Sequence, residues 1–187
     1  MKRNQVVLIY GLPASGKYTV AKMIQNQCGG ILLDNHYFYD MFTNLTEDTD
    51  EKWSEYGHYV FVVRDSFLNV IRKFYPKKQH KRFIFTSVIL RGERFPKMLR
   101  KFACDIDADF IPIELSVTND VLLERCDTLA RKQRRKLHNK KEYDILLKQW
   151  APNAFHSRSP NKLVLDSSNL SPEETFKQIK KHLKKFD

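Results

Sequence analysis

The fold of this chain is decided by the stretch Val6-Val7-Leu8-Ile9-Tyr10, followed at once by Gly11-Leu12-Pro13-Ala14-Ser15-Gly16-Lys17-Tyr18-Thr19. The five apolar residues are typical of a short strand buried on both faces, and helical spacing of apolar residues begins after Lys17. Two glycines between strand and helix let the backbone curl and aim successive N–H groups at one point, where the helix N-terminus also favours an anion. We therefore predict a phosphate-binding loop, whose residues are Gly11, Pro13, Ala14, Ser15, Gly16, Lys17, Tyr18 and Thr19.

Outward from this loop, short apolar runs alternate with helical patterns to the end of the chain. We expect strands over 6–10, 31–33, 83–89, 110–117 and 163–165. We expect helices over 17–27, 59–74, 94–102, 119–130, 141–150 and 175–185, the last introduced by the capping sequence Ser171-Pro172-Glu173-Glu174. Pro112 falls inside the fourth strand, where it cannot donate a ladder hydrogen bond. Because parallel neighbours need crossover connections, the pattern predicts one α/β domain over 1–187, with helices on both faces of a parallel sheet.

Composition narrows the classes of protein that this chain can represent. With 187 residues, 42% hydrophobic and 29% charged, it is neither disordered nor collagenous. No apolar run approaches the roughly 18 residues of a membrane helix, no signal peptide is visible, and three cysteines are too few for a disulfide framework. We expect a soluble, reduced, cytoplasmic protein that does not associate with membranes. The formal charge of +11 favours polyanionic partners such as nucleotides, phosphorylated metabolites or nucleic acid.

The glycine-rich loop carries a more specific resemblance. Gly11-x-Pro13-x-x-Gly16-Lys17-x-Thr19 resembles the loop of adenylate kinases and related nucleoside-monophosphate kinases, in which the Thr likewise follows the Lys by two. The layout of the whole chain is similar to the P-loop kinase family, including shikimate kinase-like and chloramphenicol phosphotransferase-like enzymes. The resemblance implies a three-layer P-loop NTPase fold with sheet order 2-3-1-4-5 and bound MgATP. It also implies γ-phosphoryl transfer to a small acceptor, and a mobile lid over about 128–145.

Candidate acceptor-side residues follow the second and third strands. Asp34 resembles the first acid of the Asp-x-Asp motif of shikimate kinases, whose roles are metal-shell and acceptor contacts, while His36 replaces the second acid. The alternatives are that Asp34 caps the following turn and that His36 is a packing residue. In the family, an Arg on the helix that contains Arg64 grips an anionic acceptor; the alternatives are an ion pair near Asp65 or a solvated face. Arg91 falls at the same edge and is a further candidate acceptor contact.

The remaining candidates concern the metal, the nucleobase and the lid. The third strand lacks the acid that many P-loop proteins use to orient Mg²⁺, so Thr19 and Asp34 are the candidate metal residues. Arg125 resembles a family arginine that stacks on the nucleobase, and the run 166–169 resembles the adenine-side loop or is a hydrophilic turn. Lid arginines would stabilise transition-state charge, and the candidates are Arg131, Arg134 and Arg135. The competing interpretation is a basic helix that contacts nucleic acid.

Three functions remain open at this point. The leading hypothesis is a kinase that uses MgATP to phosphorylate a hydroxyl or phosphate group of a small molecule, with Lys17, Asp34, Arg131 and Arg134 as catalytic residues. A nucleic-acid 5′-hydroxyl kinase is less favoured and rests on the net charge. A nucleotide-binding regulatory protein with little turnover rests on Tyr18 and on the acid missing from the third strand. The sequence identifies neither the acceptor nor the oligomeric state, and we expect acceptor selectivity to lie between Tyr37 and Tyr59 and in the lid.

Overall fold

The computed structural model describes residues 3–43, 52–75, 81–88, 93–126, 143, 148 and 155–187. These residues form a five-stranded parallel sheet with the order β2-β3-β1-β4-β5. The strands are β1 (Asn4–Gly11), β2 (Ile31–Leu33), β3 (Arg82–Val88), β4 (Ala108–Ser116) and β5 (Leu163–Asp166). The helices are α1 (Lys17–Cys28), α2 (Asn35–Thr43), α3 (Lys52–Phe74), α4 (Arg94–Asp105), α5 (Asn119–Cys126) and α8 (Pro172–Leu183), with a final 3₁₀ turn over Lys184–Phe186. The predicted fold class and strand order are confirmed.

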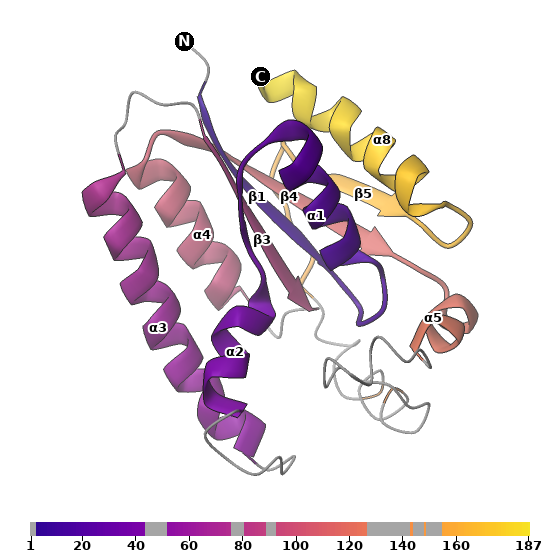
Figure 1. Ribbon diagram of the computed structural model, residues 1–187, viewed down its shortest axis with the longest axis horizontal. Helices are drawn as coiled ribbons and strands as arrows, with labels where there is room; N and C mark the ends of the chain where they lie inside the picture. Colours follow the sequence, from indigo (N-terminus) through magenta and orange to yellow (C-terminus); the bar gives the residue numbers. More distant parts are fainter. Residues whose placement is uncertain are drawn as a thin grey trace.

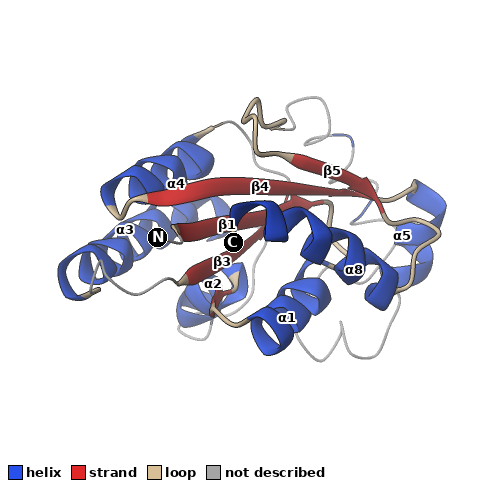
Figure 2. Ribbon diagram, turned by 90° about the horizontal axis from the view of Figure 1, so that it is seen from above, coloured by secondary structure: helices blue, strands red, loops and turns tan. Residues whose placement is uncertain are grey.

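Helices cover both faces of the sheet. Helices α1 and α8 lie on one face, and α3 and α4 lie on the other (Figures 1 and 2). Alternation along β1 divides the core accordingly: Val7 and Ile9 pack with α1 and α8, while Val6, Leu8 and Tyr10 pack with α3 and α4. Because all the strands run in the same direction, their carboxyl ends meet at one edge, and the loop after β1 lies at that edge between β3 and β4.

The helical region between β2 and β3 differs from the prediction. Helix α2 is unexpected, and α3 begins at Lys52 rather than at residue 59. Aromatic contacts join the two helices, because the Phe42 ring centroid lies 6.1 Å from that of Tyr56 and 6.3 Å from that of Tyr59. Packing between the two helices therefore stabilises helical structure that the local sequence pattern does not predict.

Two local predictions can be followed in detail. The last helix begins as predicted with a capping box, in which Ser171 Oγ accepts from Glu174 N at 3.1 Å and Glu174 Oε2 accepts from Ser171 N at 2.8 Å. Pro112 lies in β4 opposite Leu8, one residue before β4 begins to pair with β5, so its missing donor removes no bond to β5.

The helix expected over 119–130 is described only as far as Cys126, and the one expected over 141–150 lies outside the described residues apart from 143 and 148.

Both termini lie at the amino end of the sheet, opposite the glycine-rich loop (Figure 1). A buried arginine, Arg82, fixes this end and is 4% exposed. It donates from Nε to Gln5 Oε1 at 2.6 Å, from Nη1 to the carbonyl of Cys28 at 2.8 Å and from Nη2 to Asp187 Oδ1 at 3.0 Å. All three of its nitrogens therefore have partners, which is the arrangement that a purely structural buried cation requires.

We expect Arg82→Met to lower the free energy of unfolding by about 3 kcal/mol, because three acceptors lose their charged donor at a buried site. Urea denaturation would measure the change. Arg3→Met is the matched control: Arg3 also bridges two carboxylates, of Asp107 and Asp109, but its side chain is 53% exposed. That control should cost less than about 1 kcal/mol. Equal losses in the two variants would contradict a stabilising role for the buried network.

Among the described helices, none combines the length and the apolar character that a membrane crossing requires.

Candidate functional site

The loop between β1 and α1 has the backbone geometry of an anion site. A Cβ on Gly11 would lie 2.2 Å from the carbonyl oxygen of Leu115 in β4, so only glycine fits where the two strands approach. Ala14 and Gly16 both adopt left-handed conformations, with φ of 65° and 85°, and Ser15 N–H closes the turn onto the carbonyl of Leu12 at 3.2 Å. Such conformations turn neighbouring N–H groups toward one concavity, and α1 has no acidic residue in its first turn to compete with an anion.

Lys17, which the sequence predicts to bind phosphate, lies against this loop. Its Nζ donates to the carbonyl of Leu12 at 2.5 Å and to Ser15 Oγ at 3.1 Å, and Ser15 is 2% exposed. The next residue, Tyr18, packs against the core cluster between the sheet and helices α1 and α8. Thr19 is exposed on α1. Tyr18 is thus accommodated by packing, while the assignment of Thr19 to the metal remains a prediction.

Asp34 follows β2 at the carboxyl edge of the sheet and is 4% exposed. Its carboxylate accepts a hydrogen bond from the hydroxyl of Thr86 in β3, and the same hydroxyl accepts from the backbone N–H of Asn35 at 3.1 Å. Thr86 is in register with Ile9, which packs on the α1 side of the sheet. Asp34 and Thr86 therefore meet on the face that also carries α1 and the phosphate loop. This position is compatible with a role toward nucleotide-bound metal.

Arg64, a candidate acceptor contact, is unusually buried for a charged side chain. It projects from α3, is 4% exposed, and donates from Nη2 to Asn35 Oδ1. Its guanidinium carbon lies 4.5 Å from the ring centroid of Phe95 and 5.5 to 5.6 Å from three further rings, those of Phe38, Tyr39 and Phe61. In the part of the chain that the structure describes, its Nε has no hydrogen-bond partner. Burial lowers the pKa of Arg64 to about 10.

These contacts speak against both structural alternatives that the sequence left open for Arg64, while its role toward an acceptor remains a prediction. The residue is not on a solvated face, and Asp65 pairs instead with Arg72, with 4.0 Å between Oδ1 and Nη1. Among the described residues, the only hydrogen-bond partner of Arg64 is the neutral amide of Asn35. A desolvated guanidinium with an unused donor is energetically costly and is typical of a site that binds an anion.

Of the remaining candidates for the acceptor and the lid, the structure describes His36 but not the others. His36 Nδ1 lies 3.7 Å from Asp40 Oδ1, one turn along α2, and its assignment to the acceptor remains a prediction. Arg91 lies outside the described residues. So do Arg131, Arg134, Arg135 and, apart from Tyr143, the lid expected over about 128–145.

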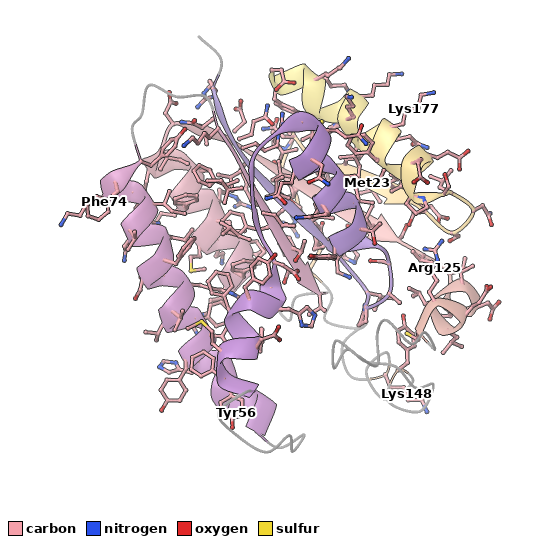
Figure 3. The ribbon with its side chains drawn as sticks, viewed as in Figure 1. Met23, Tyr56, Phe74, Arg125, Lys148 and Lys177 are labelled. Atoms are coloured by element: carbon pink, nitrogen blue, oxygen red, sulfur yellow. The ribbon has the colours of Figure 1, made fainter. Side chains whose placement is uncertain are left out.

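The two segments proposed for the nucleobase side come together. Arg125 Nη2 donates to the carbonyl oxygens of Ser167 at 3.2 Å and Ser168 at 3.5 Å, and Figure 3 shows Arg125 on α5 beside the loop that follows β5. The loop is also held internally, because Asp166 Oδ1 accepts from the Ser168 hydroxyl and backbone N–H at 2.6 and 2.9 Å, which lowers the pKa of Asp166. Their functional role remains a prediction, but their proximity is established.

Comparison with known proteins gives a clear answer for the fold. No protein-family model and no curated protein sequence matches the chain. Among solved structures, a "putative kinase" from Chloroflexus aurantiacus has a TM-score of 0.71 at 16% identity, with 100% of both chains covered. The gluconokinase of Sinorhizobium meliloti 1021 has a TM-score of 0.60 at 14% identity, covering 99% of this chain and 94% of that one. The chain has the P-loop kinase fold. The shikimate kinase of Bacteroides thetaiotaomicron is similar to the same extent, with a TM-score of 0.59, 16% identity, and 96% and 98% coverage.

Within this P-loop kinase fold, two polar residues of the candidate site, Thr86 and Asn35, were not predicted from the sequence. Thr86 does leave a signal, because Thr86 and Ser87 are polar residues that follow the apolar run 83–85, at the edge where open α/β sheets bind ligands. Asn35 leaves none beyond its position after Asp34. A second cluster was also missed: Glu114 in β4 accepts from the Tyr10 hydroxyl at 3.0 Å and lies 3.0 Å from His156 Nδ1.

Proposed function

We propose that this protein is a kinase that transfers the γ-phosphoryl group of MgATP to a hydroxyl or phosphate group of a small molecule carrying an anionic group. The observation that carries the proposal is the buried guanidinium of Arg64, whose Nε has no partner among the described residues. Arg64 is joined through Asn35 and Thr86 to Asp34, at the edge that also bears the phosphate loop. The P-loop kinase fold supports the phosphoryl donor, and Arg64 supports the charge of the acceptor.

The residues present fit Mg²⁺ as the metal. In nucleotide sites this ion is held by one or two protein oxygen donors together with substrate phosphates, so the carboxylate of Asp34 and the hydroxyl of Thr19 are sufficient. No cluster of three or more His, Cys, Asp or Glu side chains occurs among the described residues, and none is required. When bound, the ion would neutralise charge on the transferring phosphates.

The chain's own groups account for the remaining requirements. Pro13 has no backbone N–H and that of Ser15 bonds to the Leu12 carbonyl, so the other backbone N–H groups of the loop would cradle the phosphates while Lys17 neutralises charge that develops on them. Arg64 would bind the anionic group of the acceptor and so orient its hydroxyl toward the γ-phosphorus. The hydroxyl oxygen forms the new P–O bond, the bond from the γ-phosphorus to ADP breaks, and the hydroxyl proton passes to Asp34. Arg131 and Arg134 are the proposed lid arginines, and Arg91 and His36 are proposed acceptor contacts.

The first experiment is an assay of MgATP-dependent ADP release with pooled acceptors: nucleosides, nucleoside monophosphates, hydroxy acids including shikimate, aminoglycosides and a 5′-hydroxyl oligonucleotide. We expect an anionic small-molecule pool to stimulate release. We expect Lys17→Ala to lower the stimulated rate on the order of 100-fold, because a charged donor to the transferring phosphates is lost. Lys22→Ala is the matched control, since Lys22 is on the same helix but bonds to Gln25 Oε1 at 2.9 Å on the exposed surface.

Other outcomes of this assay would contradict the proposal or the role of Lys17. Stimulation by the oligonucleotide alone, falling steeply with ionic strength, would contradict the small-molecule acceptor and support nucleic-acid phosphorylation. Tight binding of Mg-nucleotide with no stimulation by any pool would support a regulatory nucleotide-binding protein. Loss of activity in Lys22→Ala equal to that in Lys17→Ala would contradict the assignment of Lys17.

A further inference from the structure

A continuous series of hydrogen bonds crosses the carboxyl edge of the sheet. Arg64 Nη2 donates to Asn35 Oδ1, the backbone N–H of Asn35 donates to Thr86 Oγ1 at 3.1 Å, and the Thr86 hydroxyl donates to Asp34. Arg64, Thr86 and Asp34 are each 3 to 4% exposed. Water therefore competes weakly for these groups, and the bonds hold their partners in place more firmly than bonds at the surface do.

The donors in this series have fixed directions. The Asn35 N–H belongs to the first residue of α2, where a helix offers no carbonyl partner of its own, and Thr86 Oγ1 fills that role. A threonine hydroxyl has one proton, so a hydroxyl that accepts from Asn35 has that proton available for the Asp34 carboxylate. The rotamer of Thr86 and the orientation of Asp34 are consequently set together.

The series also joins the two sides of the site. Thr86 lies on the α1 face, because it is in register with Ile9 of the core cluster beneath α1. Arg64 projects from α3, which lies on the opposite face (Figure 2). Asn35 bridges them, with its side chain toward Arg64 and its backbone toward Thr86. A group that binds Arg64 therefore acts on the same asparagine whose backbone fixes the hydroxyl beside Asp34.

We propose that Thr86 and Asn35 are positioning residues that connect the acceptor-binding guanidinium of Arg64 to the carboxylate of Asp34. The inference rests on the proposed function and adds to it a role for two residues that act through Arg64 and Asp34. Binding of the acceptor's anionic group at Arg64 holds Asn35, Asn35 holds the Thr86 hydroxyl, and that hydroxyl keeps Asp34 oriented toward the reacting hydroxyl. Loss of the connection should therefore affect turnover more than binding, because both substrates keep their direct contacts.

The test uses the full-length protein and three variants. Thr86→Val removes the hydroxyl at nearly constant shape, Thr86→Ser keeps it, and Thr175→Val is the matched control. Thr175 is also 3% exposed, and its hydroxyl donates to the Ser171 carbonyl at 2.9 Å in α8. We expect Thr86→Val to lower kcat on the order of 100-fold with the KM values for ATP and acceptor changed less than about threefold. Thr86→Ser should recover kcat to within about fivefold of wild type, and Thr175→Val should keep it.

A second measurement reports on the connection without activity. Hydrogen exchange of the Asn35 amide, followed by NMR, should accelerate in Thr86→Val and remain slow in Thr86→Ser, because Thr86 Oγ1 is its acceptor. Faster exchange with an unchanged kcat would overturn the positioning role, as would a raised acceptor KM with kcat intact. Unchanged exchange would overturn the connection itself. A wild-type protein that phosphorylates no acceptor would instead reject the proposed function, and the positioning role with it.

Discussion

Gly11→Ala should lower the free energy of unfolding by roughly 3–5 kcal/mol, and nucleotide binding should be lost with it. The added Cβ would lie 2.2 Å from the carbonyl oxygen of Leu115, an atom of the neighbouring strand that no side-chain rotation can move. This clash can be relieved only if β1 and β4 separate at the point where the phosphate loop begins. Urea denaturation followed by circular dichroism measures the loss, and titration with a fluorescent nucleotide measures the site.

Gly57→Ala is the control for this prediction. Gly57 lies inside α3, and a Cβ there meets nothing within 4 Å. Alanine is the better helix former, so this variant should gain about 0.5–1 kcal/mol. A Gly11→Ala protein that is as stable as wild type would show that the two strands separate at this point without cost, and would remove the steric reason for a glycine.

Arg64→Met should lower kcat/KM for an anionic acceptor on the order of 10³-fold, because it removes the buried charged donor that we assign to the acceptor. The stability of the protein should not fall with its activity. Methionine has a similar length and packs well among Phe38, Phe61 and Phe95, so the free energy of unfolding should be unchanged or about 1–2 kcal/mol higher. Steady-state kinetics and urea denaturation of the same preparation test both statements.

The contrast with Arg82 makes this prediction specific. Both arginines are 4% exposed, but Arg82 has partners for all three nitrogens, whereas Arg64 Nε has none among the residues that the structure describes. Substitution by Met should therefore destabilise the protein at position 82, and at position 64 it should leave the protein folded with a strongly lowered kcat/KM. A destabilised Arg64→Met protein with normal kcat/KM would show that Arg64 is structural, and Arg64→Lys should be intermediate because lysine keeps the charge but loses the planar fork.

Structural features that depend on residues close together in the sequence were predicted well. The loop from Gly11 to Lys17, the alternation of strands with helices and the capping box at Ser171 each depend on residues within a few positions of one another. Helix α2 was missed, and the start of α3 was placed too late. The contacts that support them, such as those of Phe42 with Tyr56 and Tyr59, join residues more than a dozen positions apart.

The candidate site divides in the same way. Asp34 and Arg64 could be selected as candidates from their place in the pattern and from the family resemblance, but the burial of Arg64 and its contact with Asn35 could not be predicted from the sequence. Thr86 became a candidate only through its hydrogen bond to Asp34, although β2 and β3 were expected to be neighbours. Arg125 and the loop at Ser167 were each proposed separately, and their contact depends on the tertiary fold.

The order of the chain gives the acceptor side a modular character. Helices α2 and α3, which carry Asn35 and Arg64, form one uninterrupted insertion between β2 and β3, while the phosphate loop and the Arg125 contact come from other segments. One stretch of gene thus encodes most of what we assign to acceptor recognition. Exchange of residues 35–75 between proteins of this fold is therefore a direct route to altered acceptor preference, provided that the graft retains the Asn35 contact with Thr86.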